Sequence, residues 1–137
     1  MPGKLTHKEM KFVSKEWGYE LWIVNNDMYC GKILFLKKGK NCSYHYHKIK
    51  DEVLYVQHGK IAFIHDDLLA SNKQMDILEE GDAWHVTPGI VHQMVALEDT
   101  FIHEFSTQHF DEDSHRICRD VQVTFRLDGS VCLETTG

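Results

Sequence analysis

The sequence lacks most features that mark membrane, secreted or nucleic-acid-binding proteins. Only two of its 137 residues are proline, and no apolar run approaches the roughly 20 residues that span a membrane. The N-terminal stretch MPGKLTHKEMK is polar and has no apolar signal-peptide region, which predicts a cytoplasmic protein without a membrane partner. Basic residues are outnumbered, 15 against 21 acidic ones, and the net charge of −6 argues against a nucleic-acid partner.

The cysteines also form no recognisable pattern. Cys30, Cys42, Cys118 and Cys132 lie far apart and include no CxxC pair, so we expect reduced thiols. The hydrophobic content of 42% is that of a globular protein, and the length favours a single domain over residues 1–137.

Short runs rich in β-branched and aromatic residues recur along the chain and are separated by glycine-containing turns. Such spacing predicts an all-β protein, an antiparallel sandwich or barrel. The Asp128-Gly129 pair predicts a hairpin turn near the C-terminus. One helix is expected over residues 5–16, where Thr6 and Glu9 have the spacing of a capping box. Most expected strands are apolar on both faces, so the second face packs against another sheet or subunit, and we expect a homodimer.

The most unusual count is ten histidines, because histidine is the commonest side chain for binding transition metals. In a strand, His45 and His47 point to the same face. Glu52 opens the next strand, where its carboxylate comes beside the two imidazoles. His92 begins the strand after the Pro88-Gly89 turn and can complete a set of three imidazoles and one carboxylate. This set suits one divalent ion (Zn first, or Fe, Mn, Co or Ni) and leaves open positions for a substrate.

These two segments resemble the two motifs of the cupin family. Residues 39–59 match G-x5-HxH-x4-E-x6-G at every position, and residues 81–92 match GD-x4-PPG-x2-H except that Thr87 replaces the first proline. Many cupins also have asparagine where this chain has Ala96. The resemblance implies an antiparallel jelly-roll β-barrel (double-stranded β-helix) with the metal inside.

Both ends of the domain add a narrower resemblance. The segment KEWGYE at residues 15–20 is similar to the KPWGxE opening of the cupin domain in type II mannose-6-phosphate isomerases, and residues 104–116 are similar to that family's closing segment. The resemblance implies a metal-dependent aldose–ketose isomerase for a sugar or sugar phosphate. His103 and Glu104 share one strand, so one of them faces the interior as the candidate acid/base residue, and the family favours Glu104.

Two other functions stay open at this point. The same ligands can hold Fe(II) in a dioxygenase, and a cupin can also bind a sugar or metabolite without turning it over. Lys48 and Lys50 are expected as charges of an exposed turn, where with Arg116 they could attract a phosphate. The acidic run at residues 111–113 is expected to be a solvated loop.

Overall fold

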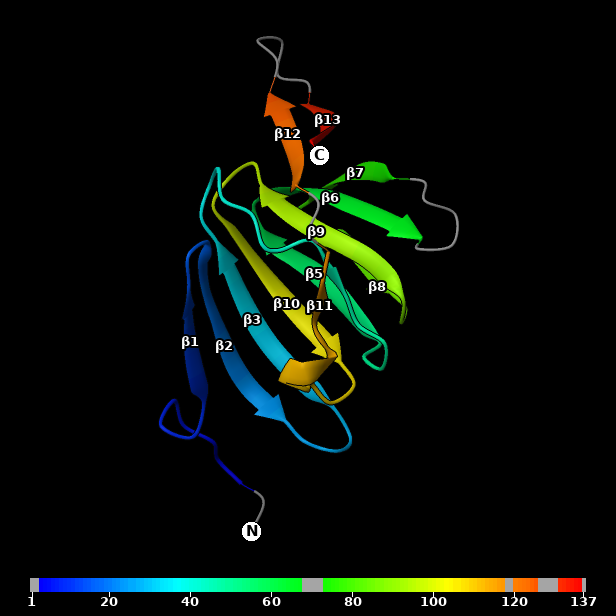
Figure 1. Cartoon of the computed structure of the whole chain (residues 1–137). Helices are drawn as coiled ribbons and strands as arrows, with labels where there is room; N and C mark the ends of the chain where they lie inside the picture. Colours follow the sequence, from blue (N-terminus) through cyan, green and yellow to red (C-terminus); the bar gives the residue numbers. More distant parts are fainter. Residues whose placement is uncertain (1–2, 68–72, 118–119, 126–130, 137) are drawn as a thin grey trace.

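The chain folds into two antiparallel sheets that face each other (Figure 1). The computed structural model describes residues 3–67, 73–117, 120–125 and 131–136, with only the backbone at Asp67 and in the last two segments. The strands are β1 (Lys11–Lys15), β2 (Gly18–Asn25), β3 (Cys30–Leu36), β4 (His45–Tyr46), β5 (Glu52–His58), β6 (Lys60–Asp67), β7 (Gln74–Glu79), β8 (Ala83–Val86), β9 (Ile90–Ala96), β10 (Thr100–Ser106), β11 (His115–Arg116), β12 (Asp120–Phe125) and β13 (Val131–Thr136), with a 3-10 turn, η1, at Asp111–Asp113.

After β1, β2 and β3, which share one sheet, the chain passes repeatedly between the two sheets, and among the described strands of these sheets only β6 and β7 then follow each other in the same one. The six-stranded sheet has the order β1-β2-β3-β10-β5-β8, and the five-stranded sheet has the order β11-β4-β9-β6-β7. Strands distant in sequence are therefore neighbours, as where β10 lies between β3 and β5. This arrangement confirms the predicted all-β jelly-roll sandwich and brings β4, β5, β9 and β10 around one interior.

The main apolar core fills one part of the space between the sheets. It is built from alternate residues of strands in both sheets, which bury their side chains inward while their neighbours point outward. Its members are Leu34, Leu36, Cys42, Leu54, Val56, Ile61, Phe63, Leu78, Val86, Met94, Ala96 and Ile102. A second apolar cluster lies on the outer side of β6 and β9 and includes Ala62, Ile64, Val91 and Val95.

The glycine that ends the first motif has a clear steric role. Gly59 joins β5 to β6 with a φ of +105°, a conformation that other residues rarely adopt. A Cβ atom at this position would lie 2.4 Å from Thr100 Oγ1 and 2.5 Å from the Asp99 carbonyl oxygen. Only glycine allows β10 to approach this turn so closely.

The helix expected over residues 5–16 is wrong. One half of the capping box forms, since Thr6 N–H donates to Glu9 Oε2 at 2.6 Å, while Thr6 Oγ1 accepts from Lys8 N–H at 3.3 Å and Glu9 N–H donates to the Thr6 carbonyl oxygen. They close only one turn, because the chain then enters β1 and pairs with β2 from Lys11 to Lys15. Pairing between strands outweighs the local helix signal at this point.

The C-terminal strands β12 and β13 pair with each other as a hairpin. The predicted Asp128-Gly129 turn lies outside the described residues, as do the side chains of Cys118 and Cys132. Cys30 and Cys42 are buried free thiols, and burial raises the pKa of Cys42 to about 11. Within the described part of the chain, no helix is long and apolar enough to cross a membrane.

Candidate metal centre

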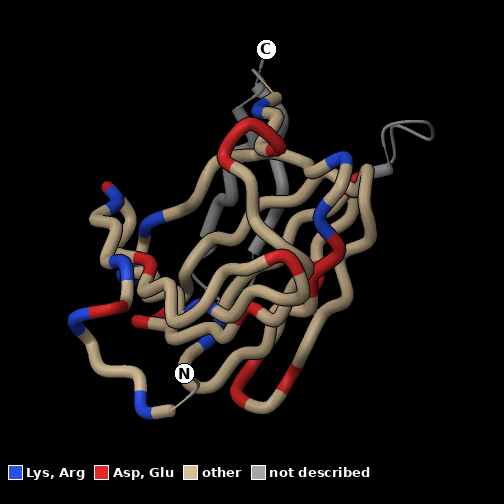
Figure 2. Tube along the Cα trace, turned by 90° about the horizontal axis from the view of Figure 1, so that it is seen from below, with Lys and Arg blue, Asp and Glu red and all other residues tan. Residues whose placement is uncertain are grey.

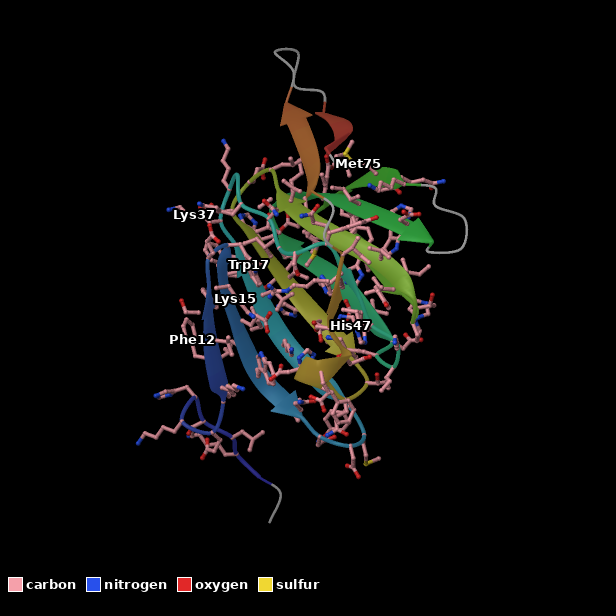
Figure 3. The ribbon with its side chains drawn as sticks, viewed as in Figure 1. Phe12, Lys15, Trp17, Lys37, His47 and Met75 are labelled. Atoms are coloured by element: carbon pink, nitrogen blue, oxygen red, sulfur yellow. The ribbon has the colours of Figure 1, made fainter. Side chains whose placement is uncertain are left out.

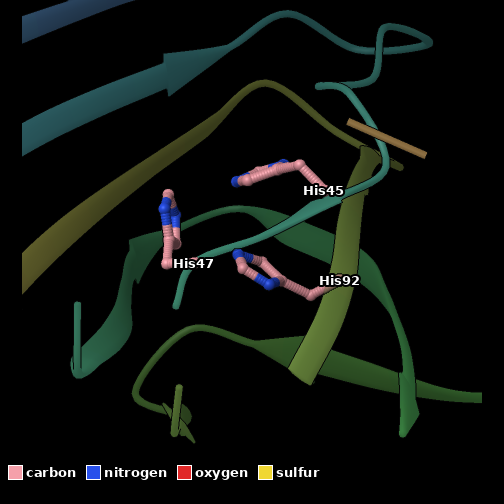
Figure 4. Close-up of side chains that lie close together, drawn as sticks. All are labelled: His45, His47 and His92. Atoms are coloured by element: carbon pink, nitrogen blue, oxygen red, sulfur yellow. The ribbon is translucent and has the colours of Figure 1, made fainter. Parts of the chain in front are cut away.

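Strand pairing brings three histidines from the two motifs together. β4 pairs with β9 so that His45 lies opposite His92. The Gly89 N–H of the second motif donates to the His47 carbonyl oxygen at 2.7 Å, which attaches the Pro88-Gly89 turn to the first motif. Nitrogens of the three rings lie within 4.8 Å of one another (Figure 4), so this cluster can hold a metal ion.

All three imidazoles are held in the same tautomer. Each Nδ1 lies within hydrogen-bond distance of a backbone carbonyl oxygen: 2.8 Å for His45 to Ser43, 3.0 Å for His47 to Asp113 and 3.0 Å for His92 to Ile90. A carbonyl oxygen can only accept, so each Nδ1 carries a proton and Nε2 is the atom of each ring that could bind a metal. Such backbone contacts orient histidine ligands in metal sites.

Burial keeps two of these rings neutral. It lowers the pKa of His45 to about 3, and the neighbouring His92 adds to this effect. Burial and the charge of Lys50 lower the pKa of His47 to about 4. Neutral imidazole is the form that binds a metal, so neither ring must first lose a proton near neutral pH.

Glu52 supplies a carboxylate beside the three rings. It is buried at the start of β5, with Oε1 3.4 Å from His92 Nε2 and Oε2 3.7 Å from His47 Nε2. Burial disfavours the charged form, but His92 and the Lys50 ammonium lower the pKa of Glu52 below its ordinary value. Among the described residues, buried Glu52 Oε2 accepts no hydrogen bond of good geometry, and the cation facing it is the Lys50 ammonium at 3.2 Å. A metal ion at the histidines would therefore share this carboxylate with Lys50.

The donor set fits a divalent transition metal. Ligand atoms around an ion at about 2.1 Å lie roughly 3.0–3.4 Å apart. The separations of 3.4 and 3.7 Å between Glu52 and the two imidazoles are close to this range. Three imidazole nitrogens and one carboxylate oxygen are accepted by several such metals, so the residues do not select one.

Lys50 lies inside the cavity, and its expected place on an exposed turn is wrong. Its Nζ is 3.2 Å from Glu52 Oε2, 3.0 Å from Glu104 Oε2 and 3.0 Å from His109 Nδ1. Burial opposes the ammonium, but Glu104 and Glu52 raise its pKa above the ordinary value. The sequence did carry a signal for this position: Lys50 precedes Glu52 by two residues, so an extended backbone places both on one face.

The structure separates the two candidate acid/base residues on β10. Glu104 faces the cavity, is buried, and accepts hydrogen bonds from Lys50 Nζ and from Ser106 Oγ at 2.9 Å. His103 faces the other side of the sheet, where its Nε2 lies 2.8 Å from Gln57 Oε1. Only Glu104 is therefore close to the histidine cluster.

Asp113 organises the first motif from a distant part of the chain, which corrects its expected place in a solvated loop. Its buried carboxylate accepts hydrogen bonds from the backbone N–H groups of Lys48, Ile49 and Lys50, while its carbonyl oxygen accepts from His47 Nδ1. Burial opposes ionisation, but these N–H groups lower the pKa of Asp113. More than 60 residues separate the partners, so no local pattern could reveal the contact.

A cavity of about 680 Å³ contains the histidine cluster. Glu52, Lys50 and Glu104 line it on one side, while Lys11, Lys15 and Arg116 belong to its outer part. Figure 3 shows His47 inside the barrel and Lys15 near β1. The volume is within the range of small-molecule sites, so a ligand has room beside a bound ion.

The chain resembles solved structures in fold, although no protein-family model and no curated protein matches its sequence. Oxalate decarboxylase from Bacillus subtilis matches with a TM-score of 0.72 and 19% identity over 82% of this chain and 31% of that one. The capsular polysaccharide assembling protein CapF from Staphylococcus aureus matches with a TM-score of 0.72 and 16% identity over 79% of this chain and 32% of that one.

The chain thus spans about a third of the length of each of these proteins. At such identities the similarity shows the fold alone. The chain has a cupin fold, and its two antiparallel sheets enclose a buried three-histidine cluster that can hold a metal ion.

Proposed function

We propose that the chain is a metal-dependent cupin enzyme that isomerises a small sugar or sugar phosphate between its aldose and ketose forms. The observation that carries this proposal is a second buried carboxylate, Glu104, in the same cavity as the metal centre. Lys50 joins it to Glu52, because one ammonium lies within 3.2 Å of an oxygen of each carboxylate. The metal site uses the three histidines and the Glu52 carboxylate, so the Glu104 carboxylate is left to act on a substrate.

The reaction requires a proton to move between two adjacent carbons. A divalent ion at the three histidines and Glu52 would stabilise the negative charge that develops on the two substrate oxygens. Glu104 takes the proton from the hydroxyl-bearing carbon and returns it to the former carbonyl carbon, while the hydroxyl proton passes between the oxygens. Lys50 and Ser106 fix the Glu104 carboxylate at Oε2 and leave Oε1 for this transfer.

The outer part of the cavity supports a polar and charged substrate. Lys11, Lys15 and Arg116 line it and could attract a phosphate group. Glu20 and Asp111 line the same cavity and offer acceptors for sugar hydroxyl groups. This mixture suits a sugar phosphate better than an apolar metabolite.

The test begins with metal analysis of the purified chain, followed by an isomerase assay on a panel of sugars and sugar phosphates with each candidate metal. Oxalate belongs in the panel because one similar structure is an oxalate decarboxylase. We expect turnover of at least one aldose–ketose pair, and a Glu104→Gln variant that keeps the metal but loses about 100-fold or more of the rate. His103→Gln, on the opposite face of the same strand, is the matched control and should keep the rate.

Three results would contradict the proposal. A metal-loaded Glu104→Gln variant with full activity would remove the proposed acid/base residue. Oxygen consumption by an iron-loaded sample with a chelating substrate would instead indicate a dioxygenase. Tight sugar binding without turnover under any metal would indicate a binding protein.

A further inference from the structure

The outer face of the six-stranded sheet is rich in apolar side chains, and the carboxylate next to it, Asp51, lies at its edge beside His85 of β8. Every second residue of its strands points away from the cavity, and none of these outward residues is Lys, Arg, Asp or Glu. The inward positions of the same strands do carry charges, such as Lys32, Glu52 and Glu104. Figure 2 shows the charged residues gathered in certain segments, with long uncharged stretches between them.

Aromatic side chains form a continuous row across this face. Ring centroids are 5.0 Å apart for Phe12 and Tyr19, 5.4 Å for Tyr19 and Phe35, and 4.9 Å for Phe35 and Phe101. These four residues come from β1, β2, β3 and β10, so the row runs across four neighbouring strands. Figure 3 shows Phe12 on the outer side of β1.

Several aromatic side chains of this outer face are exposed to solvent in the single chain. Phe12 is 62% exposed, Phe105 is 55% exposed and Tyr55 is 37% exposed. A mostly apolar groove of about 440 Å³ adjoins Phe105 and Ile33 on the same face. Contiguous exposed apolar surface of this kind marks an interaction site in a soluble protein.

At the centre of the opposite sheet, the described outward residues of β6 and β9 are buried instead. Ala62, Ile64 and Val91, on the outer side of β6 and β9, are at most 1% exposed in the single chain. The chain therefore covers one outer face by itself and leaves the other bare. The outer face of the six-stranded sheet therefore has exposed apolar side chains that a partner could bury.

We infer that this face is the surface through which two copies of the chain pair. The strands of this face present no lysine, arginine or carboxylate to a charged partner, whereas a second identical apolar face is complementary to it in a two-fold dimer. Six strands of four to eight residues, spaced about 4.8 Å apart, give a flat footprint of roughly 600 Å². Standard stable interfaces bury about 800 Å² per partner. Side chains that project from the sheet make its accessible surface larger than this flat footprint, which brings the buried area close to that value.

Sedimentation velocity on the full chain, from about 1 to 100 µM, tests this inference. We expect a species near twice the 16.0 kDa of one chain. Phe105→Glu and Tyr55→Glu each place a charge in the face and should weaken dimerisation at least about 30-fold. Ile77→Glu is the matched control, because Ile77 is also 37% exposed but lies on β7 of the other sheet.

Hydroxyl-radical footprinting of the unmodified chain gives a readout that does not depend on variant folding. Tyr55 and Phe105 should become protected as the concentration rises, while Met75 on β7 should not change. A chain that stays monomeric throughout, which would leave the face for a different partner, overturns the inference. A dimer that survives both glutamate substitutions, or one that Ile77→Glu disrupts equally, overturns it as well.

Discussion

The two ends of the barrel interior are built from the same strands but have opposite chemistry. On β5, Glu52 lies at one end and Leu54 and Val56 at the other. On β10, Glu104 lies at the polar end and Ile102 lies at the apolar end. The other shared strands repeat this change, with Lys32 before Leu34 and Leu36 on β3, and His92 before Met94 and Ala96 on β9.

This difference separates what stabilises the fold from what performs the chemistry. Burial of the apolar end supplies hydrophobic free energy, and a loss there is a loss of stability. The polar end is tolerated only because its charges are paired and its rings are hydrogen-bonded. Substitutions at the two ends should therefore have different signatures in stability and in metal binding.

The largest effect should come from breaking the charge balance of the polar end. Lys50→Met removes the cation that contacts both Glu52 and Glu104 and leaves two buried carboxylates without their shared partner. We expect the metal-free chain to lose about 3–5 kcal/mol of unfolding free energy, measured by urea denaturation. Zinc should restore part of this loss, because it brings positive charge back beside Glu52.

Lys48→Met is the control for this change. Lys48 lies in the same turn but is exposed, so its replacement should cost less than about 0.5 kcal/mol. Equal losses for Lys48→Met and Lys50→Met would show that the buried charge network does not hold the polar end together.

Leu54→Ala tests the apolar end. Leu54 is 1% exposed and belongs to the main core, so truncation leaves a cavity and should cost about 3 kcal/mol. Metal affinity of the folded variant should stay close to that of the unmodified chain, as measured by calorimetric titration under native conditions. A large loss of affinity with unchanged stability would reverse the roles assigned to the two ends.

Asp113→Asn should have a smaller effect that is confined to the polar end. The substitution weakens the hydrogen bonds to the turn that follows His47 and so loosens the orientation of that ring. We expect metal affinity to fall about 10-fold. Glu112→Gln, an exposed neighbour in η1, should leave the affinity unchanged. If both variants bind metal equally well, the Asp113 contact does not support the site.

His103→Gln should have the smallest effect. The side chain lies on the outer face and contacts Gln57, away from the histidine cluster. We expect stability within about 0.5 kcal/mol and metal affinity within error of the unmodified chain. A clear loss of metal binding would mean that the outer face of β10 affects the interior more than its contacts indicate.

The sequence was most informative where a local rule and the fold agree. Strand alternation placed His45 and His47 on one face, and the short runs between glycine-containing turns predicted an all-β protein. It was misleading at residues 5–16, because the capping box of Thr6 and Glu9 is local whereas the pairing of β1 with β2 is not.

The parts of the site that the sequence did not predict depend on long-range contacts. Asp113 reaches the first motif across more than 60 residues, and the sequence near either partner does not indicate that contact. Strand alternation could have placed Lys50 on the same face as Glu52, but its charge and its position in a turn predicted an exposed side chain. Buried Lys50 is paired with Glu104 as well as Glu52, and Glu104 comes from β10, which only the fold brings beside β5.

X-ray absorption spectroscopy of the zinc-loaded chain tests the central claim most directly, because it reports the ligands of the ion itself. We expect one ion per chain with a first shell of nitrogen and oxygen at about 2.0–2.2 Å and the scattering pattern of about three imidazoles. His92→Ala should reduce the imidazole count by one. An ion surrounded by oxygen alone, or a chain that takes up no ion, would contradict the account.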